Sequence, residues 1–115
     1  MPYVQVRTSV SLTEKQITAM KDELSPAIAL IPGKVEEGLM IEFVPDCQLY
    51  FAGSNAQPAA YVTVLTNNEI EEPLLRPYSE KLFTVISQVT EIPKQRIYIV
   101  HQDLPKWHSG RKWYS

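Results

Sequence analysis

The stretch MPYVQVRT, residues 1–8, places a proline directly behind the first methionine and then runs into a strand pattern. Val4 and Val6 alternate with polar side chains, which is the period of a half-buried β-strand. If Met1 is removed, Pro2 becomes a secondary amine held at the end of a sheet, and such an amine can act as a base. Met-Pro is also a common start without chemical meaning, so the rest of the chain has to decide between these interpretations.

The first half of the chain predicts a strand, a helix and a second strand. A capping box beginning at Thr13 starts the helix, Ser25-Pro26 predicts a kink or restart within it, and Pro32-Gly33 ends it. Residues 39–44 have few polar positions, so we expect this second strand to be covered on both faces. Residues 48–51 predict a further short strand.

The second half repeats this order of elements. Residues 59–66 are rich in β-branched side chains and predict a strand. Acidic residues precede Pro73, which is typical of a helix start, and Ile92-Pro93 ends that helix. Residues 96–102 alternate as a last major strand, and the tail 104–115 is polar and aromatic.

The two halves therefore form a duplicated β-α-β unit, with pseudo-repeats over residues 2–45 and 58–102. Each crossover is long enough to contain a helix, so each pair of strands should be parallel and right-handed. We predict an α+β fold, a two-layer α/β sandwich in which a four-stranded mixed sheet carries both helices on one face. Nothing else in the chain can cover the other face, so we expect copies of the chain to associate through it.

The composition indicates one domain over residues 1–115, with 44% hydrophobic and 21% charged side chains. A net charge of -2 offers no basic surface for nucleic acid or an anionic membrane, and no apolar run reaches the roughly 18 residues of a membrane span. We expect neither partner, and no signal peptide. Cys47 is the only cysteine, which excludes an internal disulfide and a multi-cysteine zinc site and favours the reducing cytoplasm.

Several short motifs follow one another in the order of a known family. They are the initial Met-Pro, Gly33-Lys34 at the first helix-to-strand junction, Val44-Pro45-Asp46, Phe51-Ala52-Gly53-Ser54, and Arg96-Ile97-Tyr98-Ile99 in the last strand. In this order and spacing, from Pro2 to at least Asp103, the chain resembles the macrophage migration inhibitory factor family of the tautomerase superfamily.

The resemblance implies a homotrimer with active sites at subunit interfaces, which catalyses keto–enol tautomerisation of phenylpyruvate-like α-keto acids. Pro2 would be the catalytic base, and Lys34 would bind the substrate carboxylate with help from the backbone at Asn67. Tyr98 would reach in from the neighbouring subunit. The implied reaction needs no cofactor and no metal. We expect a cytoplasmic location, with secretion by a non-classical route as a further possibility that the resemblance implies.

Elementary chemistry supports these roles for Pro2 and Lys34. An amine base that works near neutral pH must have its cationic form disfavoured, and both burial and a nearby cation lower its pKa. Lys34 also offers a point charge for a carboxylate or a developing enolate. Its simpler interpretation is a lysine at a helix C-terminus, where the dipole favours positive charge.

Two departures from the family pattern limit what can be transferred. Ala59 and Val62 stand where vertebrate members have a Cys-x-x-Cys, so thiol–disulfide chemistry is not expected. Val100 stands where the best-known members have a substrate-binding asparagine, which keeps a non-catalytic, cytokine-like or interaction protein as the alternative. A related isomerase or hydratase would need an arginine-rich pocket, and Arg7 and Arg96 are not placed to supply it.

Other candidate groups carry weaker signals. His101, Asp103 and His108 cross from a strand end into a loop, and no thiol or further close carboxylate completes a metal site. We therefore expect no bound metal. Cys47 follows a turn and has no obvious base beside it, so we expect an inert thiol.

Overall fold

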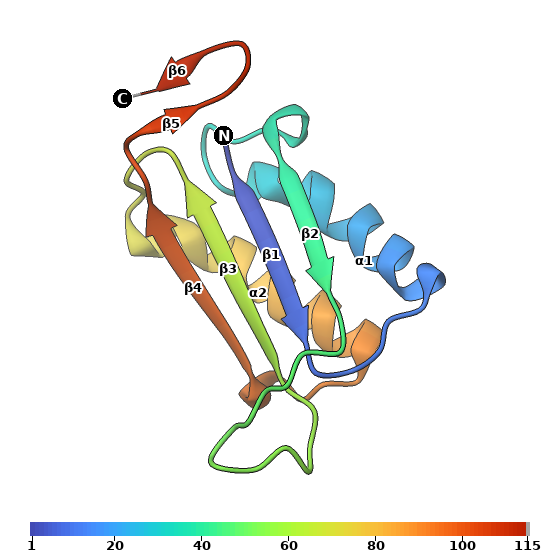
Figure 1. The fold of residues 1–115 in the computed structure, drawn as a ribbon. Helices are drawn as coiled ribbons and strands as arrows, with labels where there is room; N and C mark the ends of the chain where they lie inside the picture. Colours follow the sequence, from blue (N-terminus) through green and yellow to red (C-terminus); the bar gives the residue numbers. More distant parts are fainter. Residues whose placement is uncertain (115) are drawn as a thin grey trace.

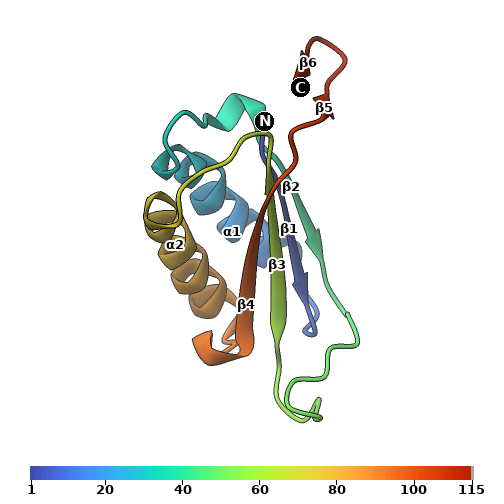
Figure 2. The same ribbon diagram turned by 90° about the vertical axis from the view of Figure 1, so that its left-hand side faces the viewer.

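The computed structural model describes residues 1–114 and has two layers, a sheet and a pair of helices packed on one of its faces (Figures 1 and 2). The sheet order is β2-β1-β3-β4, and its strands are β1 (Tyr3–Thr8), β2 (Met40–Val44), β3 (Ala60–Thr66) and β4 (Ile97–Asp103). β1 and β2 are parallel, as are β3 and β4, while β1 and β3 are antiparallel. The predicted mixed sheet built from two β-α-β units is therefore confirmed.

The first helix, α1 (Glu14–Ala27), begins at the predicted capping box. Thr13 Oγ1 accepts a hydrogen bond from the Gln16 backbone at 3.1 Å, and Gln16 Oε1 accepts one from the Thr13 backbone at 2.9 Å. These two bonds satisfy amides that the start of a helix leaves without partners. Pro26 lies in the last turn of α1, after which the chain tightens into the 3₁₀ helix η1 (Ile28–Leu30) without the separate restart that the Ser25-Pro26 pair allowed.

The second helix, α2 (Glu72–Thr90), has Pro73 in its first turn, where the missing N–H has no intrahelical partner to lose. Glu91 adopts a left-handed conformation with φ of 63° and ends the helix. The 3₁₀ helix η3 (Lys94–Arg96) then leads into β4. Both helix boundaries agree with the sequence prediction to within a few residues.

The core lies between the helices and one face of the sheet. It contains Val4, Val6, Val62 and Val64 from the central strands, Met20, Leu24 and Ile28 from the first helical segment, and Tyr78, Leu82, Val85 and Ile86 from α2. Each fully buried aliphatic side chain contributes on the order of 1.5–3 kcal/mol. This core fixes the strands whose ends carry the candidate site.

Strand β2 differs from its prediction, because only one of its faces is covered in the single chain. Met40 pairs with Tyr3 and shares its face, which the helices do not cover, and Met40 is 68% exposed. β2 is also an edge strand of the sheet. The predicted short strand at residues 48–51 is also wrong, since Phe51 forms only an isolated bridge with Ser54.

The sheet face away from the helices carries polar and aromatic side chains. Tyr3 and Gln5 of β1 both hydrogen bond to Glu42 of β2 on this face, and Tyr98 and Val100 of β4 are exposed there. No element of the described chain covers this face (Figure 2). It is the surface through which the sequence analysis expects copies to associate.

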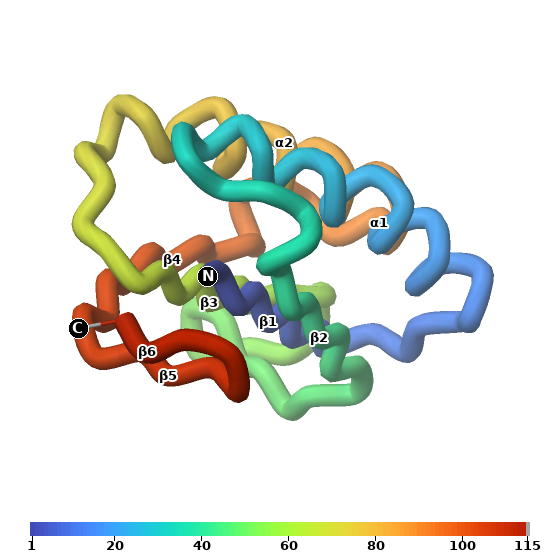
Figure 3. Tube along the Cα trace, turned by 90° about the horizontal axis from the view of Figure 1, so that it is seen from above, coloured from blue at the N-terminus to red at the C-terminus, as the bar shows by residue number. Residues whose placement is uncertain are grey.

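The chain ends in a small hairpin of β5 (Trp107–His108) and β6 (Trp113–Tyr114). His108 stacks on Trp113 with ring centroids 4.1 Å apart. The hairpin lies beyond the sheet, at the end that carries the N-terminus and on the side away from the helices (Figures 1 and 3). None of the helices within residues 1–114 is both long and apolar enough to cross a bilayer.

Candidate functional site

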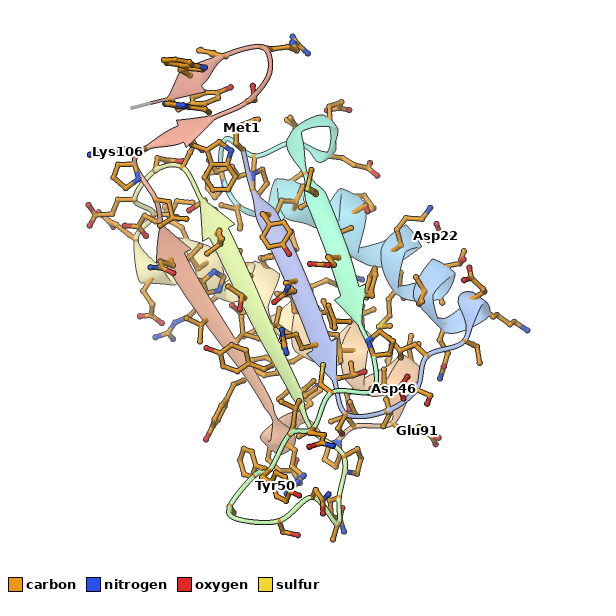
Figure 4. The ribbon with its side chains drawn as sticks, viewed as in Figure 1. Met1, Asp22, Asp46, Tyr50, Glu91 and Lys106 are labelled. Atoms are coloured by element: carbon orange, nitrogen blue, oxygen red, sulfur yellow. The ribbon has the colours of Figure 1, made fainter. Side chains whose placement is uncertain are left out.

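Pro2 directly precedes β1, a central strand, and it is tied to the neighbouring strand β2. Its ring is buried, and its carbonyl accepts a hydrogen bond from the Met40 backbone at 3.1 Å. The 3₁₀ helix η2 (Glu36–Gly38) passes close by: a Cβ placed on Gly38 would lie 3.9 Å from Pro2 Cδ and from Met1 Sδ. Met1 marks this end of the sheet in Figure 4. The sequence prediction of a rigidly held Pro2 is consistent with this geometry.

Lys34 follows η1 in the connection between β1 and β2, and its side chain reaches the end of the sheet where Pro2 lies. Gly33 has a φ of 83°, a left-handed conformation that glycine adopts without steric cost, and this turn redirects the chain after η1. The Lys34 backbone donates to the Ile31 carbonyl at 3.1 Å. The Lys34 side chain therefore points inward, and the residue is only 8% exposed.

Asn67 joins the two because it follows β3, whose end lies beside the start of antiparallel β1. Its Oδ1 accepts a hydrogen bond from Lys34 Nζ at 2.9 Å and another from the Met1 amine at 3.1 Å. Because both nitrogen atoms donate to the same oxygen, the distance between them cannot exceed the sum of the two hydrogen-bond lengths. Asn68 accepts a further hydrogen bond from Lys34 Nζ.

The electrostatics of this cluster disfavour positive charge at the chain start. Burial lowers the pKa of the Met1 amine, and the neighbouring Lys34 charge lowers it further. Burial also lowers the pKa of Lys34, an effect that its interaction with the N-terminal amine partly offsets. An amine placed here holds its proton less tightly than in water, which is the property that a base working near neutral pH requires.

Tyr98 is not part of this cluster within one chain. It pairs with Tyr61, which in turn pairs with Arg7 at the far end of β1. Tyr98 is 58% exposed, and its ring lies against Phe51 with centroids 5.3 Å apart. The structure thus brings together Pro2, Lys34 and Asn67 and leaves Tyr98 at the opposite end of the sheet.

Two hollows of the described surface lie away from Pro2. One of about 290 Å³ is lined by residues near the end of β1 and the following loops, among them Ser9, Cys47 and Pro58. The other, of about 440 Å³, lies between α2 and η3, beside Phe83 and Lys94. Neither of these two hollows is lined by Pro2, Lys34 or Asn67.

The metal candidates are engaged elsewhere. His101 Nε2 lies 2.8 Å from Ser79 Oγ on the helix face of the sheet, and His108 stacks in the terminal hairpin. Within residues 1–114, no three His, Cys, Asp or Glu side chains gather as a metal site would need. These two histidines therefore belong to separate parts of the fold.

Sequence reasoning missed two contributors to the site. It gave Asn68 no role in the site, yet the Asn68 side chain accepts a hydrogen bond from Lys34. It also gave no role to Gly38, which lies against Pro2. The signal for the first was the Asn67-Asn68 pair directly after a buried strand, because amide side chains at strand ends can face a shared edge of the sheet.

Comparisons with known proteins support the family resemblance and the fold. The family described as "Macrophage migration inhibitory factor (MIF)" matches residues 1–113. Macrophage migration inhibitory factor of Xenopus laevis is 30% identical over 104 residues, covering 90% of this chain and 89% of that protein. The Trichinella spiralis homolog is 32% identical over 102 residues, covering 86% and 85% respectively. The crystal structure of Leishmania major MIF2 superposes with a TM-score of 0.88 at 25% identity, covering 99% of this chain and 97% of that one.

Proposed function

The chain belongs to the macrophage migration inhibitory factor family, and on this premise we propose that it is a keto–enol tautomerase of phenylpyruvate-like α-keto acids. Its base is the Pro2 amine that removal of Met1 exposes. The observation that carries the proposal is the single Asn67 oxygen that binds both the N-terminal amine and the Lys34 ammonium, at 3.1 and 2.9 Å. Membership of the tautomerase superfamily supports an isomerase in general.

The proposed reaction moves one proton and needs no cofactor. The neutral Pro2 amine takes a proton from the carbon beside the keto group, and the electrons of the broken C–H bond form an enolate. The enolate oxygen then takes a proton back from the Pro2 ammonium, which gives the enol and restores the base. Burial and the Lys34 charge support this role, because they lower the pKa of an amine at this place and so favour its unprotonated form.

Lys34 binds the substrate in this proposal. The residue is 8% exposed, and its ammonium lies beside the chain start. A substrate carboxylate that pairs with Lys34 places its keto group next to the amine, and the same charge stabilises the enolate as it develops. The backbone at Asn67 assists the same carboxylate.

A homotrimer completes the proposed site. Tyr98 lies at the far end of its own sheet from Pro2, so a Tyr98 that contacts substrate has to come from a neighbouring subunit. The uncovered sheet face and the open edge of β2 support association of copies. A cytoplasmic location, with secretion by a non-classical route as the alternative, is part of the same proposal.

A matched pair of proteins tests the enzyme proposal. In the chain with Met1, the Pro2 nitrogen is a tertiary amide whose lone pair is delocalised, so it cannot act as a base. We expect tautomerisation of enol-phenylpyruvate by the form that begins at Pro2 and almost none by the Met1-bearing form, with intact mass spectrometry identifying each. Equal activity in the two forms would remove Pro2 as the base.

A non-catalytic interaction protein of the same fold is the second candidate. The observation that favours it is Val100, which is 39% exposed on the open face and cannot hydrogen bond through its side chain. Rates no better than buffer for the Pro2-initiated form would favour this candidate for the phenylpyruvate class of substrates.

A further inference from the structure

Two consecutive asparagine side chains hold the Lys34 ammonium. Asn67 Oδ1 accepts from Lys34 Nζ at 2.9 Å, and Asn68 Oδ1 accepts a second hydrogen bond from the same nitrogen. Since an ammonium offers only donors, the oxygen of each amide, and not its NH₂ group, must face Lys34. The two residues therefore present a pair of partial negative charges to one buried cation.

The loop backbone is held independently of these oxygens. Thr66 Oγ1 donates to the Asn68 carbonyl at 3.1 Å, and the Leu104 backbone donates to the Thr66 carbonyl at 2.7 Å. The Asn68 Nδ2 group points to the Glu69 carbonyl at 3.4 Å. The turn after β3 thus has its own support, and the two Oδ1 atoms are engaged with Lys34 without being needed to fold the turn.

An amide oxygen suits this position better than the alternatives. A buried ammonium without acceptors tends to lose its proton, because desolvation penalises the charged form. A carboxylate in place of the amide would keep Lys34 charged but would compete with an anionic substrate for it. A neutral acceptor preserves the charge and leaves it available.

We propose that the side-chain oxygens of Asn67 and Asn68 are positioning groups, which keep the Lys34 ammonium charged inside the site and aim it at the substrate. This inference rests on the proposed tautomerase function and adds two side chains to it. Lys34 Nζ has three N–H donors, of which two point to the asparagines. The third is left for one oxygen of the substrate carboxylate, so the carboxylate binds through a single hydrogen bond.

Removal of Met1 leaves this arrangement in place. The Met1 amine shares Asn67 Oδ1 with Lys34 but makes no contact with Asn68 Oδ1 among the hydrogen bonds of residues 1–114. When the chain begins at Pro2, Asn67 Oδ1 loses the Met1 amine, and we expect it to keep its hydrogen bond with Lys34. The positioning role therefore applies to the form that we propose to be active.

The experiment is an NMR titration of the lysine side chains, labelled with ¹³C, on both the Met1-bearing chain and the form that begins at Pro2. In Asn67→Ala, Asn68→Ala and the double variant, the Lys34 pKa should fall further, most in the double variant, since the ammonium loses acceptors. In Asn68→Asp, which keeps the side-chain shape, it should rise. Lys81, which pairs with Glu23 elsewhere, is the internal control, and Asn55→Ala is the matched variant.

Kinetics of the Pro2-initiated form supply the second measurement. Each single alanine variant should raise KM for phenylpyruvate about three- to tenfold, with a smaller change in kcat, and should move the high-pH limb of kcat/KM to lower pH. An unchanged Lys34 pKa in a folded double variant would overturn the proposal. If the double variant fails to fold, an unchanged Lys34 pKa in Asn68→Asp would overturn it instead. Absence of activity in the parent protein would sink the tautomerase proposal alone, because the titration needs no turnover.

Discussion

Tyr98 lies at the opposite end of the sheet from Pro2. Tyr98 pairs with Tyr61 across β3 and β4, and Tyr61 pairs with Arg7 across β1 and β3. Arg7 is five residues beyond Pro2 in the same strand, which corresponds to roughly 16 Å along an extended chain. The loop that carries Tyr50 lies at this far end, while Met1 lies at the other (Figure 4). One substrate cannot touch both residues of one chain.

A subunit-mixing experiment tests whether they meet between chains. A chain with an alanine inserted before Pro2 and a Tyr98→Ala chain should each be nearly inactive. Refolded together, they should recover about a quarter of the parent activity, since a quarter of the sites in a random trimer combine an intact Pro2 with an intact Tyr98. The readout is the tautomerase assay on the mixture.

The control for this experiment is the same mixture prepared without unfolding, which should stay inactive while the oligomers do not exchange. Sedimentation equilibrium at micromolar concentration should report a mass near three subunits. A monomer in that measurement, or a refolded mixture as inactive as its components, would contradict the composite site.

Removing the Lys34 charge should weaken substrate binding more than turnover. Lys34→Met keeps most of the side-chain length but cannot pair with a carboxylate, so KM should rise about tenfold or more, with a smaller fall in kcat. Steady-state kinetics on one keto acid measure both constants. Lys94→Met, a change at an exposed lysine beside α2, is the matched control and should leave both constants near the parent values. Unchanged constants in Lys34→Met would make Lys34 an ordinary lysine at a helix end.

The same substitution should change the pH dependence. Burial and the Lys34 charge both lower the pKa of the Met1 amine, and we expect the same of a Pro2 amine at this place. The base form is then favoured, and it is lost as the pH falls through that lowered pKa. Without the Lys34 charge, the amine binds its proton more tightly. The low-pH limb of kcat/KM should therefore move to higher pH in Lys34→Met, as a pH–rate profile of the Pro2-initiated form can show. A shift in the other direction would contradict the electrostatic coupling.

The fold was predictable because its signals are local and repeated. Alternating valines predicted β1, and the capping box predicted the start of α1 at Thr13. The place of β2 at the edge of the sheet was not predictable in the same way. An apolar strand has the same sequence pattern whether helices or a second subunit cover its faces. Strand order decides that question, and strand order depends on contacts distant in sequence.

The candidate site was predictable only in part. The family motifs pointed to Pro2 and Lys34, and the structure brings both residues to one end of the sheet. The Asn68 contact depends on how the chain turns after β3, and two adjacent asparagines are equally typical of an ordinary turn. A side chain's role is invisible to sequence reasoning when the residue type already has a sufficient local explanation.

His101 should make the stability of the fold sensitive to mild acid. Its Nε2 lies 2.8 Å from Ser79 Oγ, while its Nδ1 is buried without a hydrogen-bond partner among residues 1–114. Burial lowers the pKa of His101, because desolvation penalises the charged ring. The second N–H of the charged ring would also have no hydrogen-bond partner within residues 1–114. Folding therefore favours the neutral ring. The resulting stability is complete above the ordinary histidine pKa of about 6.5 and is lost as the pH falls below it toward the lowered pKa of the folded state.

We expect thermal unfolding to show this loss directly. His101→Gln keeps a neutral side chain that can pair with Ser79, so its melting temperature should fall about 2–4 °C less than that of the parent between about pH 7.5 and pH 5. His108→Gln is the matched control, because His108 is exposed in the terminal hairpin, and it should follow the parent curve. If the melting temperatures of His101→Gln and His108→Gln both fall as much as that of the parent over this pH range, carboxylates and not the buried imidazole ring cause the acid sensitivity. A smaller loss in His101→Gln alone would assign it to the orphaned Nδ1.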